Sequence, residues 1–114
     1  MDIRSEVKKM KEDSPKMAAL SLETRNQALL AVAEALQQQK EKIFEANQKD
    51  LEAAAESGLP QSVQKRLKFD AHKLADVISG IKELVKLPDP LSQVQLSRQL
   101  DDHLNLYRVT CPIG

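Results

Sequence analysis

Cysteine and histidine are the residue types best suited to covalent chemistry, and this chain holds one cysteine, Cys111, and two histidines. A cysteine thiolate becomes a good nucleophile when a neighbouring base lowers its pKa. His103 could act as that base, but two residues on one expected β-ribbon make a weak case for a nucleophile and its base. We therefore interpret Cys111 as an unreactive strand cysteine and assign no catalytic residue.

Residues that could bind a metal or a cofactor are equally sparse. His72 has no second histidine or cysteine at ligand spacing, so we interpret it as a surface residue. Asn47 lies on the apolar side of a helix and could contact a ligand, although such an amide is more often satisfied by a neighbouring backbone group. Glycine occurs only at Gly58, Gly80 and Gly114, which excludes a P-loop and a dinucleotide fingerprint. We therefore predict no metal-binding residue and no cofactor-binding residue within this chain.

The composition limits both the size of the core and the kind of partner. A chain of 114 residues forms one domain and buries roughly two-thirds of its unfolded surface. Lys and Arg total 17, as do Asp and Glu, so we expect no nucleic-acid partner and no anionic membrane partner. A single cysteine fits a reducing compartment, the cytoplasm by default. The N-terminus does not resemble a signal peptide, and no apolar run approaches the ~20 residues of a membrane span.

The chain up to residue 90 shows the periodicity of helices. Apolar residues from Ile3 onward predict an amphipathic first helix with a kink or restart at Pro15. Ser21 can cap a second helix. The polar run 37–40 marks either a break or the exposed side of a turn, and a third helix follows it and ends at Gly58.

Two further helices are expected after this corner. The first is short and begins at Pro60, and Asp70 caps the second, which is stronger. The second helix has a wide apolar stripe that other helices must cover. The stripe consists of Leu74, Val77, Ile78, Ile81, Leu84 and Val85.

The pattern changes period after Pro88 and Pro90, which end the helical part. Val94 and Leu96 alternate with polar residues, and a second strand-like run covers 104–109, with a loop near 100–103. The expected fold class is mainly α with a C-terminal β-hairpin or ribbon. We divide the chain into a helical segment, 1–90, and a β-ribbon, 91–114. A two-stranded ribbon is marginal alone, so its position at the end of the sequence is typical of a protein cut short.

The spacing of residues does not indicate a function, whereas a family resemblance does. In sequence order and spacing, the chain resembles the N-terminal portion of the gamma-glutamyl phosphate reductase family, also called glutamate-5-semialdehyde dehydrogenases. The resemblance extends from about Val7 to Gly114. It rests on Ser21-Leu22-Glu23-Thr24-Arg25-Asn26, the run from Leu29 to Leu36, Ala46-Asn47-Gln48-Lys49-Asp50-Leu51, Ser57-Gly58-Leu59, Lys65-Arg66-Leu67, Leu87-Pro88-Asp89-Pro90, Arg108-Val109 and Pro112-Ile113-Gly114.

The resemblance implies the N-terminal part of an aldehyde dehydrogenase-like α/β fold and an oxidoreductase of proline biosynthesis. That enzyme reduces L-glutamyl 5-phosphate with NADPH to the 5-semialdehyde and phosphate. A cysteine thiolate displaces the phosphate to form a thioester, which hydride from the nicotinamide then reduces. The family's nucleophile lies beyond the end of this chain, and Cys111 does not match it. No catalytic or cofactor residue can be carried over, so we expect the chain alone to be inactive.

The family also implies a nucleotide-binding domain that holds NADPH and a homo-oligomer when the enzyme is full length. One alternative is non-enzymatic, namely a small helical interaction module whose ribbon adds to the edge of a partner's sheet. Another is a parent that fuses the reductase to a kinase of the same pathway, and other aldehyde dehydrogenases share the general helical pattern.

Overall fold

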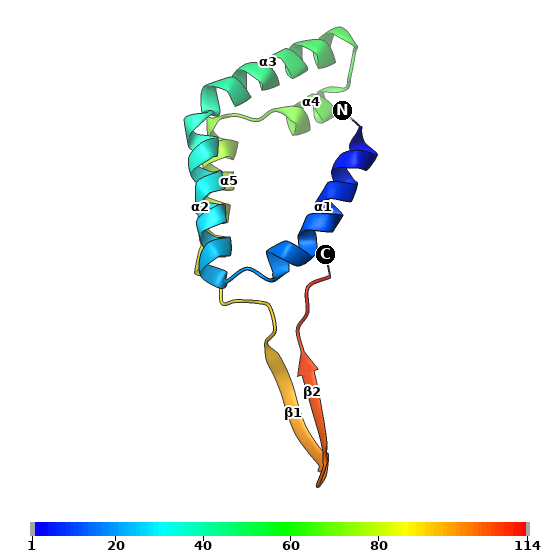
Figure 1. Ribbon diagram of the computed structural model, residues 1–114. Helices are drawn as coiled ribbons and strands as arrows, with labels where there is room; N and C mark the ends of the chain where they lie inside the picture. Colours follow the sequence, from blue (N-terminus) through cyan, green and yellow to red (C-terminus); the bar gives the residue numbers. More distant parts are fainter. Residues whose placement is uncertain (1, 114) are drawn as a thin grey trace. The chain divides into compact units, whose positions relative to one another are not determined.

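The protein, described by a computed structural model over residues 2–113, consists of five helices followed by a two-stranded antiparallel sheet (Figure 1). This confirms the expected fold class, mainly helical with a C-terminal hairpin. The helices are α1 (Ile3–Ala18), α2 (Leu22–Gln38), α3 (Lys40–Glu56), α4 (Gln61–Leu67) and α5 (Ala71–Lys86), and the strands are β1 (Val94–Asp101) and β2 (Leu104–Val109).

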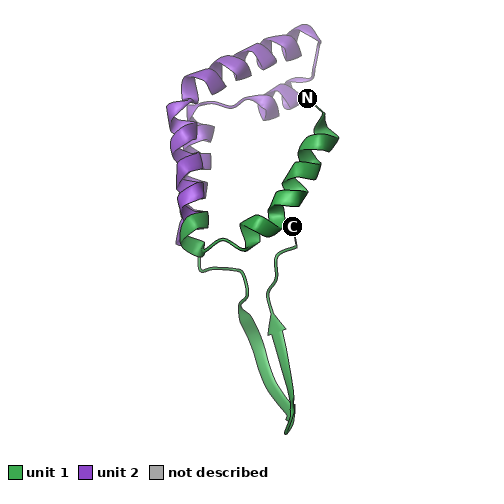
Figure 2. Cartoon of the chain, in the orientation of Figure 1, with its two compact units in different colours: residues 1–25, 87–114 green, residues 26–86 purple. Residues whose placement is uncertain are grey.

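The chain forms two compact units, which Figure 2 distinguishes by colour. One unit comprises residues 26–86, and the other combines residues 2–25 with residues 87–113. The second unit therefore holds α1, the start of α2 and the whole ribbon. The division into 1–90 and 91–114 that we expected from the change of period after Pro88 and Pro90 stays a prediction.

Helix α1 runs without interruption through Pro15, so the restart considered at this residue does not occur. Asp2 begins the helix by accepting a hydrogen bond from the backbone N–H of Arg4 at 3.2 Å. Pro15 lies near the helix end, where its missing N–H removes a single backbone hydrogen bond. The N–H of Ala19 donates to the carbonyl of Pro15 at 3.2 Å, which continues the helical pattern beyond the proline.

Side-chain caps begin two helices as predicted. The hydroxyl of Ser21 accepts the N–H of Thr24 at 3.1 Å, and a carboxylate oxygen of Asp70 accepts the N–H of Lys73 at 3.0 Å. The polar run 37–40 contains a break, since α2 ends at Gln38 and α3 begins at Lys40.

The corner after α3 is closed by Gly58 in a left-handed conformation, with φ 73°. Its N–H donates to the carbonyl of Ala55 and the N–H of Leu59 donates to the carbonyl of Ala54, each at 3.1 Å. These two bonds satisfy carbonyls at the helix end and require a positive φ, which explains the glycine. Helix α4 starts directly after Pro60, as expected.

The core of unit 26–86 is small. Ala33, Ala54 and Leu74 are the buried apolar residues in the part of the chain that the structure describes. Helices α2 and α5 are in contact. The side-chain amide of Asn26 donates to the carbonyl of Val85 at 3.3 Å. The α5 stripe is covered only in part: Leu74 is buried, Val77 and Leu84 are exposed, and the other three members are half-buried.

Candidate functional site at the β-ribbon

Strands β1 and β2 form the ribbon, which pairs from Val94 opposite Val109 to Asp101 opposite Leu104. The register shifts twice, between Val94 and Leu96 and between Gln99 and Asp101. Such irregularities bend a strand and increase its twist. Because the sheet has two strands, both are edge strands with unpaired backbone groups available to another strand.

The ribbon carries large apolar side chains that nothing within residues 2–113 covers. Leu96 is half-buried, and every other residue of the two strands is exposed. Two free edges with apolar side chains on both strands can accept a further strand or a packed surface. The exposed apolar residues of the ribbon are Val94, Leu100, Leu104, Leu106, Tyr107 and Val109.

Thr110 closes the base of the ribbon. Its hydroxyl accepts the N–H of Gln93 at 2.8 Å and donates to the carbonyl of Pro90 at 2.7 Å. Its backbone N–H donates to the carbonyl of Gln93 at 3.0 Å, and its carbonyl accepts the N–H of Ser92 at 3.1 Å. One residue after β2 thus binds three residues that precede β1.

Asp89 joins this base to the start of α2. One carboxylate oxygen of Asp89 lies 2.8 Å from Nη2 of Arg25 and also accepts the N–H of Leu91 at 3.0 Å. The hydrogen bond from Arg25 and then that from Leu91 hold the pKa of the Asp89 carboxyl below its ordinary value. Arg25 also donates through Nε to the carbonyl of Leu20 at 3.4 Å. Both side chains are mostly covered, with 17% of Arg25 and 29% of Asp89 exposed.

Sequence reasoning missed the pair of Arg25 and Asp89 and the role of Thr110. Asp89 entered only as part of a family motif. An aspartate between two prolines has few conformations, which is a signal of a fixed turn. Its partner lies 64 positions away, so periodicity could not identify it.

The structure does not bring Cys111 and His103 together. His103 lies in the turn between the strands, whereas Cys111 is exposed and follows the end of β2. The six residues of β2 separate them by about 20 Å at ~3.3 Å per residue. The placement of Cys111 in a strand was wrong by two residues, because Pro112 has no N–H with which to continue the sheet.

The other two residues considered as ligands have structural explanations. Asn47 donates to the carbonyl of Leu67 at 2.9 Å and accepts the N–H of Phe69 at 2.8 Å, which confirms that backbone groups satisfy its amide. The side chain of His72 is 82% exposed, with Nδ1 3.4 Å from an oxygen of Asp76, which confirms a surface histidine. Residues 2–113 contain no group of three side chains suited to a metal ion.

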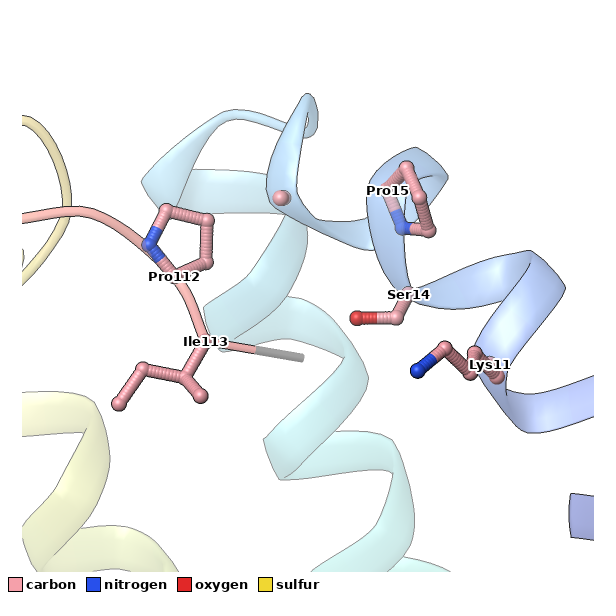
Figure 3. Close-up of a pocket in the computed structure, with 6 residues that line it drawn as sticks. Lys11, Ser14, Pro15, Pro112 and Ile113 are labelled. Atoms are coloured by element: carbon pink, nitrogen blue, oxygen red, sulfur yellow. The ribbon is translucent and has the colours of Figure 1, made fainter.

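An open hollow of about 350 Å³ lies between α1 and the last described residues. Lys11 and Ser14 point from α1 toward the segment that carries Pro112 and Ile113 (Figure 3). Ile113 is almost fully exposed, and no buried polar side chain lines the hollow. These groups do not form an enclosed binding site.

Among the described residues, no helix is both long and apolar enough to cross a membrane.

Several curated relatives of the chain share one name. The chain is 48% identical over 114 residues to gamma-glutamyl phosphate reductase of Ruminiclostridium cellulolyticum. The matched region is 100% of this chain and 26% of the relative. The protein of the same name from Nostoc punctiforme is 46% identical over 106 residues, covering 93% of this chain and 24% of the relative. No family model matches the chain.

Solved structures give the same result. The crystal structure of gamma-glutamyl phosphate reductase from Saccharomyces cerevisiae matches with TM-score 0.83 and 38% identity, over 89% of this chain and 26% of that one. The structure of the protein of the same name from Thermotoga maritima matches with TM-score 0.85 and 28% identity, over 96% of this chain and 26% of that one. The resemblance inferred from the sequence is confirmed, and the chain spans about a quarter of the length of these proteins.

Proposed function

We propose that this chain, which is similar over its whole length to gamma-glutamyl phosphate reductases, is the N-terminal part of such an enzyme. The enzyme would reduce L-glutamyl 5-phosphate with NADPH to L-glutamate 5-semialdehyde in proline biosynthesis. The observation that carries this proposal is the agreement of sequence and backbone with proteins of that name across nearly all of the chain.

The chain alone has no reductase activity in this proposal. The reaction needs a thiolate that attacks an acyl phosphate, and such a thiolate needs a base or a positive charge beside it. Cys111 is exposed, follows the end of β2 and is far from His103. The catalytic cysteine and the residues that hold NADPH therefore belong to the remaining three-quarters of the enzyme.

Two further properties of the enzyme belong to the same proposal, a cytoplasmic location and a homo-oligomeric state. A single exposed thiol suits a reducing compartment. The free edges of β1 and β2 and their exposed apolar side chains suit pairing with another strand when the enzyme is whole.

A chimera tests the proposal. This chain replaces the matching quarter of the Ruminiclostridium cellulolyticum reductase, and NADP⁺ reduction is measured with glutamate 5-semialdehyde and phosphate. We expect kcat/KM within about tenfold of the parent, a change of about 1.4 kcal/mol in the barrier. A folded chimera without turnover would contradict the proposal. Turnover by the isolated 114-residue chain would contradict its inactivity.

A non-enzymatic interaction module is the second candidate, and the open ribbon edges favour it. Such a module is a folded monomer that binds little of a dye for exposed apolar surface. For a fragment of the enzyme we expect strong dye binding, because apolar residues of α1 are exposed as well as those of the ribbon. The exposed residues of α1 are Ile3, Val7, Met10 and Met17. Weak dye binding together with an inactive chimera would favour the module.

A further inference from the structure

We propose that Arg25, Asp89 and Thr110 form a polar anchor that fixes the base of the ribbon to the corner between α1 and α2. The ribbon would then project from this corner in one set direction. This inference rests on contacts within the unit of residues 2–25 and 87–113 and does not depend on the proposed function.

The linker before β1 has a restricted backbone. Asp89 lies between Pro88 and Pro90, whose rings fix their own φ and restrict the residue that precedes each of them. The carboxylate of Asp89 is in turn held by Arg25 and by the N–H of Leu91. A stiff backbone and two hydrogen bonds to one oxygen leave this linker little freedom.

Arg25 attaches this linker to the connection between α1 and α2. Arg25 follows the cap of α2 and donates both to Asp89 and to the carbonyl of Leu20, in the connection between α1 and α2. With 17% of its side chain exposed, Arg25 is better shielded from water and salt than the ion pairs on helix surfaces, such as Lys86 with Glu83, which are 71% and 67% exposed.

Thr110 joins the linker to the ribbon. Thr110 binds Pro90 through its hydroxyl, next to Asp89, and binds Gln93 through both its hydroxyl and its backbone. Hydrogen bonds therefore connect the α1–α2 corner to both strands at their base. A motion of the ribbon relative to this corner has to break the bond of Arg25 or the bonds of Thr110.

The experiment measures the distance between spin labels on the ribbon tip and on the start of α2 by pulsed electron resonance. Labels are placed on Asp102→Cys and Glu23→Cys in a Cys111→Ser background of the 114-residue chain, at two exposed positions of the same unit. We expect one narrow distance distribution. A distribution as broad as that of an unfolded chain would overturn the proposal.

Substitutions then test the anchor itself. Arg25→Met and Asp89→Ala should widen the distribution at least twofold, whereas Lys86→Met, which breaks an exposed ion pair, should leave it unchanged. Widths equal to that of the parent in both anchor variants would overturn the proposal, as would equal widening in the control.

A second pair of variants keeps the test decisive if Arg25→Met loses its helical circular dichroism. Thr110→Val removes the hydroxyl outside both strands, and Thr110→Ser retains it. We expect widening with valine and recovery of the narrow distribution with serine. Identical distributions for the two would overturn the role of Thr110.

Discussion

The side-chain oxygen of Asn47 lies 2.8 Å from the backbone nitrogen of Phe69, and the amide nitrogen of Asn47 lies 2.9 Å from the carbonyl oxygen of Leu67. One side chain in α3 thus satisfies a carbonyl at the end of α4 and an N–H of the linker that joins α4 to α5. The amide both donates and accepts a hydrogen bond, as a backbone peptide group does in a sheet. It explains why a polar residue lies on the apolar side of α3.

We predict that Asn47→Ala lowers the free energy of unfolding by about 1–2 kcal/mol, because the N–H of Phe69 and the carbonyl of Leu67 lose their side-chain partner. Urea unfolding monitored by circular dichroism measures the effect. Gln48→Ala is the matched control, since Gln48 is exposed and bonds only to Glu52 within the same helix. Equal losses in both variants would show that the linker does not depend on Asn47.

Local patterns predicted most of the fold. Ser21, Asp70 and Gly58 lie where caps and a corner were expected, since each acts on backbone within a few residues. The restart at Pro15 was not found, because one missing hydrogen bond near a helix end costs little. The base of the ribbon was not predicted, since Arg25 and Asp89 meet only after the chain has folded over 64 positions.

Gly58 and Gly80 provide a matched pair for backbone strain. Apart from its chain neighbours and the local helix backbone, neither has an atom within 4 Å of the position that a Cβ would occupy, so space does not distinguish them. Gly58→Ala should destabilise the chain by about 1–2 kcal/mol, because alanine resists the φ of 73°. Gly80→Ala should stabilise it by about 0.5–1 kcal/mol, since Gly80 lies inside α5. Paired thermal unfolding curves measure both, and a common sign would refute the backbone explanation.

Ser92 has a positive φ of 54°, and a residue with a Cβ is strained there. Ser92→Gly relieves this strain at some cost in the entropy of the unfolded chain, so we expect a gain of about 0.5 kcal/mol. Ser97→Gly, within exposed β1, should instead cost about 0.5–1 kcal/mol. Urea unfolding of the two variants should therefore shift in opposite directions, and a loss in Ser92→Gly would show that its backbone is not strained.

Acid should weaken the protein through Asp89 and Asp70. The carboxyl of each has a pKa below its ordinary value of 3.8. The main cause is the hydrogen bond from Arg25 for Asp89 and that from the backbone of Lys73 for Asp70. A depressed pKa in the folded state means that the stabilisation is complete above the unfolded pKa and is lost as the pH falls through the folded one.

We therefore predict that stability falls below about pH 4 and that Asp89→Asn and Asp70→Asn each flatten this part of the profile. Asparagine still accepts a hydrogen bond but does not titrate, so the variants lose their charge without losing the acceptor. Urea midpoints at pH 2, 3, 4 and 6 measure the profile. Asp102→Asn serves as the control, because Asp102 is exposed in the turn between the strands. An unchanged acid slope in both variants would show that neither carboxylate is linked to folding.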